Sequence, residues 1–131
     1  MAVYDAPSLE KLLGALARAD LFLVGEMDGA ITGYLIVVVP LRTDAAEITD
    51  LAVDMASRRL GLGRTLIEAA ARWARERGHR SLWVEPRADN HAAIKFYVTL
   101  GFRVAGFNDR MYSNADHEDG RPTIFAYLEL S

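Results

Sequence analysis

Two glycines and three arginines near position 60 have the types and spacing of a phosphate-binding site. They follow the apolar segment 51–53 and lead into a helical pattern, in the order Arg58, Arg59, Gly61, Gly63 and Arg64. The first turn of a helix has N–H groups without partners in the helix, and the helix dipole adds positive charge there. Glycine lets an anion approach the main chain, and arginine adds fixed charge beside it. This segment therefore predicts a cradle for a pyrophosphate group.

Taken alone, the two glycines favour an ordinary strand-to-helix turn with solvated arginines over a phosphate site. Two other phosphate motifs do not match, because the P-loop ends in Gly-Lys-Ser/Thr and the dinucleotide fingerprint has a third glycine. The pattern that remains is Arg-x-x-Gly-x-Gly after Leu-Ala-Val. Its interpretation depends on a second segment of the chain.

That second segment, residues 90–102, reads Asn-His-Ala-Ala-Ile-Lys-Phe-Tyr-Val-Thr-Leu-Gly-Phe. With the Arg-x-x-Gly-x-Gly segment before it, it resembles the two diagnostic segments of the GNAT superfamily of N-acetyltransferases. Residues 46–48 and 81–90 look especially similar to the bacterial ribosomal-protein alanine N-acetyltransferases. The resemblance covers about residues 21–130.

The resemblance implies that acetyl-CoA is the cosubstrate. Its pyrophosphate is expected on the backbone of residues 59–64, and its pantetheine along the strand 51–53, with the thioester near Leu51. A backbone N–H of Leu51 or Ala52 would then polarise the acetyl carbonyl. The expected coenzyme-binding residues are Leu51, Ala52, Val53, Arg58, Arg59, Leu60, Gly61, Leu62, Gly63, Arg64 and Asn90.

The resemblance also implies which side chains do the chemistry. Tyr97 matches the family tyrosine near the coenzyme sulfur, and a phenol with a pKa near 10 can protonate a leaving thiolate. At its helical spacing, it also fits a plain core aromatic. Glu47 is the expected general base, directly or through water, although a solvated salt bridge is an alternative. Glu85 and Tyr112 are the other candidates, because a strand bulge changes which side chains face the cleft.

The polar loop 108–122 contains more acidic residues than arginines, and it only loosely resembles the peptide-contacting segment of those enzymes. We expect its acids to attract a cationic amine, with an ordinary solvated loop as the alternative. These acids are Asp109, Asp116, Glu118 and Asp119.

Hydrophobic periodicity predicts the elements that position these residues. Helices are expected over 7–19, 61–77 and 91–100, and strands over 21–26, 30–40, 47–53, 81–85, 102–107 and 123–130. Asp28-Gly29 lies between the first two strands and is a strong hairpin signal. Asn90 fits an N-cap, and Gly33 marks a bulge or close packing.

Composition excludes several other classes of site. The chain has 131 residues, 51% of them hydrophobic, which predicts one domain over 1–131. It has no cysteine, and its three histidines are far apart, so we expect neither a thiolate nucleophile nor a metal site. The net charge of −3 and the short longest apolar run, 34–41, predict no nucleic-acid partner and no membrane span. The expected location is the cytoplasm.

These observations together predict an α/β fold. Its sheet should be mixed, mostly antiparallel and flanked by helices, and splayed between two central strands to admit acetyl-CoA. The first strand and helix of the family are reduced to the helix 7–19, which would leave the acceptor side open or completed by a partner in a homodimer. The expected function is acetyl transfer from acetyl-CoA to a primary amine, such as a protein N-terminus. The alternatives are a small-molecule amine acetyltransferase and a non-catalytic acyl-CoA-binding regulatory module.

Overall fold

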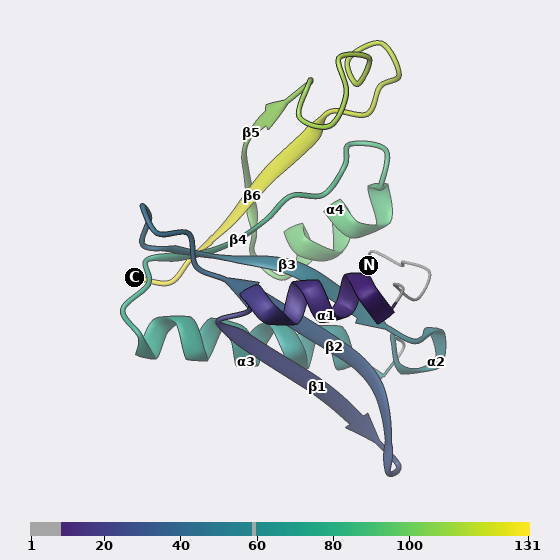
Figure 1. Cartoon of the computed structure of the whole chain (residues 1–131), viewed down its shortest axis with the longest axis vertical. Coiled ribbons are helices and arrows are strands. Elements are labelled where there is room, and N and C mark those ends of the chain that lie inside the picture. Colours follow the sequence, from purple (N-terminus) through teal and green to yellow (C-terminus); the bar gives the residue numbers. More distant parts are fainter. Residues whose placement is uncertain (1–8, 59) are drawn as a thin grey trace.

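The computed structural model describes residues 9–58 and 60–131, which form one six-stranded sheet with helices against it (Figure 1). The strand order is β1-β2-β3-β4-β6-β5, and among the described strands only β3 and β4 pair in parallel. The elements are α1 (Leu9–Arg18), β1 (Leu21–Met27), β2 (Ala30–Val38), β3 (Ala45–Val53), α2 (Met55–Arg58), α3 (Leu62–Glu76), β4 (Ser81–Val84), α4 (His91–Thr99), β5 (Arg103–Asn108) and β6 (Thr123–Glu129). The predicted fold class is confirmed.

The predicted strands and helices are present, with ends that differ by a few residues. The start of the helix predicted over 7–19 lies outside the described residues. The hairpin prediction is confirmed, since Asp28 and Gly29 both have the positive φ, 53° and 81°, that a type I′ turn needs. One element was missed: the turn before α3 also contains the short helix α2, where Asp54 Oδ1 accepts the Ser57 N–H at 2.9 Å.

The sheet is joined at its centre over a short distance. β3 and β4 pair only at Ala45↔Ser81, Ala46↔Leu82 and Glu47↔Trp83, and β3 then continues to Val53 paired with β2. β4 instead keeps its pairing with β6. The predicted splay between the two central strands is therefore present and begins after Glu47.

A bulge at Thr49 changes the alternation of β3. The β2–β3 register passes from Val37↔Ile48 to Ile36↔Asp50, so Thr49 is the extra residue. As a result, Ile48 and Leu51, three positions apart, both face the hydrophobic core. The Asp50 side chain alternates with these two core residues and lines the cavity between the splayed strands.

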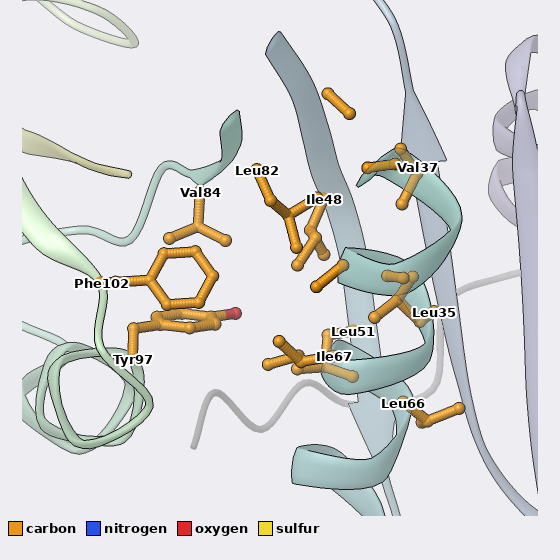
Figure 2. Close-up of a cluster of buried hydrophobic side chains, with 14 of the residues drawn as sticks. Leu35, Val37, Ile48, Leu51, Leu66, Ile67, Leu82, Val84, Tyr97 and Phe102 are labelled. Carbon is orange, nitrogen blue, oxygen red and sulfur yellow. The ribbon is translucent and has the colours of Figure 1, made fainter. Parts of the chain in front are cut away.

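Aromatic side chains fill the interior beneath the splay. Figure 2 shows the rings of Tyr97 and Phe102 beside Val84, with the Tyr97 hydroxyl directed from α4 toward the β3 residues Ile48 and Leu51. The Tyr97 and Phe102 ring centroids are 5.3 Å apart, an ordinary distance for a tilted aromatic pair. The hydrophobic core therefore remains packed beneath the gap between the splayed strands.

The start of α3 is held against the sheet by one leucine over two glycines. A Cβ on Gly25 would lie 2.5 Å from Leu62 Cδ1, and one on Gly33 would lie 2.9 Å from the Ala52 carbonyl oxygen. The β1–β2 register also skips Thr32, beside Gly33. The expectation for Gly33 is confirmed, because a bulge and close packing are both present.

None of the described helices combines the length and the apolar character that crossing a membrane requires.

We predict that Gly33→Ala lowers the free energy of unfolding by about 1–3 kcal/mol, because the new methyl group meets a fixed backbone oxygen. Gly14→Ala is the matched control, since Gly14 is exposed inside α1 and a Cβ there meets nothing within 4 Å. That control should gain about 0.5–1 kcal/mol. Urea denaturation measures both, and a Gly33→Ala variant as stable as the parent would contradict the packing described.

Candidate active site

A cavity of 310 Å³ opens where β3 and β4 part. Its walls come from β3, from the end of β4 and the residues after it, from the start of α4 and from the loop after β5. The lining residues are Glu47, Ile48, Thr49, Asp50, Leu51, Val84, Glu85, Pro86, Arg87, Asn90, Ala93, Tyr97 and Tyr112. The predicted acid and base, Tyr97 and Glu47, thus line one cavity although they lie far apart in the sequence. The two alternative candidates, Glu85 and Tyr112, line the same cavity.

Glu47 and Glu85 form a carboxyl pair at the point where the strands separate. Glu47 is the last β3 residue paired with β4, opposite Trp83, and Glu85 follows Trp83 by two positions. Burial, the Glu85 carboxyl that shares a hydrogen bond with it, and nearby Asp50 raise the pKa of Glu47 to about 8. At neutral pH the pair therefore holds one proton between two carboxyl groups.

Tyr112 covers this pair from the loop after β5. Its side chain hydrogen-bonds to Glu85, and partial burial together with the Glu85 and Glu47 charges raises the pKa of Tyr112 above its ordinary value. The Arg87 guanidinium lies 5.1 Å from the centre of the Tyr112 ring and opposes that rise. The phenol thus remains protonated and can donate to Glu85.

One prediction about the acidic loop is wrong. Asp116 was expected to attract the acceptor amine, but it is only 3% exposed and accepts a hydrogen bond from Arg87 Nη2 at 2.9 Å. Burial opposes its ionisation, but the N–H groups of Tyr112 and Ser113 and the Arg87 charge outweigh it. They hold the pKa of Asp116 below its ordinary value. Asp109, a second acid expected to attract the amine, is paired with Arg110 at 2.8 Å.

Tyr97 combines the two alternatives that the sequence left open. It is 6% exposed and belongs to the hydrophobic core, and it also lines the cavity.

Asn90 is the N-cap of α4, as predicted, since its Oδ1 accepts the Ala93 N–H at 3.2 Å. Asn90 also lines the cavity, at the end of α4 that faces the splay.

The predicted coenzyme cradle lies at the other end of the splayed strand. Gly61 is the N-cap of α3 with φ 81°, and it has no side chain to cap the N–H groups of residues 62–64. Among the described residues, nothing lies within 4 Å of the position of a Gly61 Cβ. An open space thus faces the helix N-terminus, where partial positive charge gathers.

The side chains of the cradle residues have different environments. Arg58 is partly buried, and its Nε donates to the Val53 carbonyl oxygen at 2.8 Å, which fixes the guanidinium at the end of β3. Arg64 is exposed and lies 4.0 Å from Glu68. Leu60 is exposed, whereas Leu62 and Gly63 are buried, so only the backbone of these two buried residues is suited to contact a ligand. Arg59 lies outside the described residues.

The edge of β3 between the cavity and the cradle faces the splay. Leu51, Ala52 and Val53 follow the last pairing with β4, and no described strand pairs with that edge. Leu51 is buried and lines the cavity, Ala52 is partly exposed, and the carbonyl oxygen of Val53 already accepts from Arg58. The cavity and the cradle are therefore joined along one strand.

Sequence reasoning missed the roles of Arg87 and Asp50. Arg87 follows Glu85 and Pro86 in a segment with no periodic pattern, and Asp50 reaches the cavity only because of the Thr49 bulge. Neither position has a local signal in the sequence. Among the described residues, no group of three or more His, Cys, Asp or Glu side chains is arranged to hold a metal ion.

Comparison with known proteins agrees with this geometry. A model of the acetyltransferase (GNAT) family matches residues 3–102. The ribosomal protein bS18-alanine N-acetyltransferase of Escherichia coli K12 is 38% identical over 89 residues, which are 68% of this chain and 59% of that protein. The solved structure of the E. coli enzyme superposes with a TM-score of 0.76 at 33% identity, over 96% of this chain and 79% of the other.

Antibiotic-modifying enzymes are also similar. The streptothricin acetyltransferase of Streptomyces lavendulae is 32% identical over 105 residues, which are 80% of this chain and 56% of that protein. A putative streptothricin acetyltransferase of Bacillus anthracis, solved with acetyl coenzyme A, gives a TM-score of 0.75 at 30% identity, over 82% of this chain and 61% of that one. The chain thus spans a little over half the length of the curated relatives it matches here.

We predict that the carboxyl pair makes stability depend on pH. The folded protein binds the Glu47 proton more tightly than the unfolded chain, whose Glu has the ordinary pKa of 4.5. This contribution is complete below about pH 4.5 and is lost as pH rises through about 8, with a slope of at most about 1.4 kcal/mol per pH unit. Urea denaturation between about pH 5 and about pH 9 measures the slope.

Glu47→Gln should flatten that dependence, because the amide cannot titrate. Glu76→Gln is the control, since Glu76 is exposed on α3 and should leave the slope unchanged. Parallel pH curves for the parent and Glu47→Gln would show that the pair does not hold the proton.

Proposed function

The chain belongs to the GNAT family of acetyltransferases, and from this membership we propose that it transfers an acetyl group from acetyl-CoA to a primary amine. The observation that carries the proposal is the hydrogen-bonded Glu47–Glu85 pair, which faces the same cavity as Tyr97. Such a pair can take a proton from an amine, and a buried phenol across the cavity can give one to a leaving group. A plain binding module has no need of either.

The residues of the cradle fit acetyl-CoA. The N–H groups of residues 62–64 and the open space beside Gly61 suit a pyrophosphate. Arg58 precedes Gly61 by three residues in the sequence, and its guanidinium is held at the end of β3 by the Val53 carbonyl oxygen. The edge of β3 beyond its last pair with β4 suits the amide groups of the pantetheine arm, which would bring the sulfur toward Leu51 and Tyr97. Acetyl-CoA supplies the activated acetyl group as a thioester.

The chain's own residues would then manage two protons. The ionised form of the Glu47–Glu85 pair, which is populated as pH approaches the Glu47 pKa of about 8, accepts the proton of the incoming ammonium, so the neutral amine can attack the acetyl carbon. As the carbon–sulfur bond breaks, the Tyr97 hydroxyl gives its proton to the thiolate and regains one from the amine nitrogen, which must lose a second proton to become the amide. The products are the amide and CoA. Holding both reactants in one cavity supplies part of the rate by proximity.

The pKa of the pair favours an α-amino group as the acceptor. An α-amino group has an ordinary pKa of about 7.7–8.0, close to that of Glu47, whereas a lysine side chain has about 10.4. Moving a proton from lysine to this pair would cost about 3.5 kcal/mol more than moving one from an α-amino group. The E. coli relative is named for an alanine of ribosomal protein bS18, and because alanine has no side-chain amine, only an α-amino group fits that name. A protein N-terminus would match this preference.

A small-molecule amine is the second candidate, supported by the similarity to streptothricin acetyltransferases. The deciding experiment measures CoA release with three acceptors: a peptide with a free N-terminus, an N-blocked peptide containing lysine, and streptothricin. Turnover with the first alone supports the α-amino proposal. CoA release with none of them, while acetyl-CoA binds, favours the non-catalytic module.

We predict that Gly61→Asn weakens acetyl-CoA binding at least about tenfold, because its side chain occupies the space beside the α3 N–H groups. Asn tolerates a positive φ, so the fold should survive. Gly120→Asn is the matched control, with φ 66° and open space in a distant loop. The thermal shift is the readout, since ligand at a hundred times Kd adds about 2.7 kcal/mol. Equal shifts for both variants would place the pyrophosphate elsewhere.

We predict that Tyr97→Phe lowers kcat by about ten- to ten-thousand-fold while acetyl-CoA affinity changes little, because the ring stays and only the proton donor is lost. Steady-state CoA release and a binding titration separate the two quantities. Tyr127→Phe is the control, since that tyrosine lies on β6 outside this cavity. Unaltered turnover in Tyr97→Phe would leave Tyr97 as a core aromatic and assign the proton to water or Tyr112.

A further inference from the structure

Asp116 is the one buried carboxylate among the described residues, although it lies in an exposed loop. Its Oδ2 accepts the N–H groups of Tyr112 at 3.1 Å and Ser113 at 3.2 Å, and its Oδ1 accepts Arg87 Nη2 at 2.9 Å. Its own carbonyl oxygen accepts the Arg121 N–H at 2.9 Å. Both ends of the loop 109–122 are therefore tied to this residue.

Arg87 connects the loop to the segment after β4 that carries Glu85. Its Nε donates to the Arg121 carbonyl oxygen at 3.1 Å, while its Nη2 bonds to Asp116. The neighbouring Ala88 N–H donates to the Pro122 carbonyl oxygen at 2.8 Å. The guanidinium is therefore held by Asp116 and the loop, and it lies over the Tyr112 ring.

Tyr112 is the point at which these contacts reach the cavity. Its residue is 60% exposed, so few packing contacts hold it, yet its side chain hydrogen-bonds to Glu85. Its backbone is fixed by Asp116 and its ring by Arg87. The position of this cavity wall thus depends on a carboxylate that does not line the cavity.

We propose that Asp116 is a positioning residue that holds Arg87 and Tyr112 as the acceptor-side wall of the cavity, over the Glu47–Glu85 pair. This rests on the proposed function, in which the amine meets that pair. Asp116 also neutralises Arg87, which otherwise places a cation beside the path of a cationic amine. Asp50 and the Glu47–Glu85 pair, which with its single proton keeps one negative charge, then attract the amine.

Asp116→Asn tests the proposal, with Asp119→Asn as the control. Asp119 is exposed in the same loop, so both changes remove one negative charge from it. We expect Asp116→Asn to raise the acceptor KM about tenfold or more, the scale of losing a charge-assisted hydrogen bond. We expect kcat to stay within about threefold and the acetyl-CoA Kd within about twofold, because the pair and the cradle lie on other elements. Asp119→Asn keeps the contacts to Arg87 and Tyr112, so any KM increase that it causes reflects the lost loop charge alone and should be smaller than that of Asp116→Asn. Equal KM increases in the two variants would overturn the proposal.

A merely structural role would give a different result. A partly unfolded enzyme loses kcat in proportion to its folded fraction and keeps its KM, so a fall in kcat with unchanged acceptor KM would overturn the proposal. Arg87→Gln should reproduce the KM increase, and the double variant should add little to either change, because both break one contact. Additive effects would show that Asp116 does not act through Arg87.

Hydrogen exchange gives a readout that needs no turnover. The Tyr112 and Ser113 amides should exchange slowly in the parent and in Asp119→Asn, and faster in Asp116→Asn, with the exchange of α3 unchanged. This result stands even if no amine is acetylated, so it separates failure of the clamp from failure of the proposed function. Equal exchange in all three proteins would overturn the clamp.

Discussion

The short parallel pairing of β3 and β4 is the constraint on which the rest of this structure depends. Three residue pairs join the two halves of the sheet, and beyond Glu47↔Trp83 the strands diverge. Two parallel strands cannot be joined by a tight turn. The crossover through α2 and α3 must therefore return the chain to the end of the sheet at which β3 begins, so that β4 can run beside it. That crossover places the N-terminus of α3 at the end of β3, beside the part of β3 that β4 no longer pairs with. The parallel pairing thus accounts for both the cavity and the position of the predicted cradle.

The same pairing explains how two distant glutamates come together. The register places Glu47 opposite Trp83, so Glu85 emerges directly beyond the last pair, on the open side of Glu47. Two carboxyl groups in hydrogen-bond contact and partly removed from water cannot both ionise readily, which is why the pKa of Glu47 rises to about 8. The proton on the pair is thus a consequence of strand register.

Local chemistry allowed much of the fold to be predicted from the sequence. Asp28-Gly29 dictates its own turn, and Asn90 caps α4 with its own side chain. Non-local features could not be found in this way. The Thr49 bulge that turns Asp50 toward the cavity depends on the partner strand, and the burial of Asp116 depends on Arg87, which is distant in sequence. The sequence showed Asp116 only as one acid among several, and a composition argument cannot distinguish a buried, paired acid from a solvated one.

The charges of the cleft are divided along β3. At the end of the strand, Arg58 and the N–H groups of α3 present positive charge, whereas near its start Glu47, Asp50 and Glu85 present negative charge. A cosubstrate with an anionic head and an acceptor with a cationic head would therefore approach one strand from opposite ends. The packed rings of Tyr97 and Phe102 lie beneath the splay, and the Tyr97 ring borders the space where the two reactive ends would meet. Because Glu47 is partly removed from water there, the position of each proton matters more than the number of charged groups, since an unpaired charge in such a place is costly.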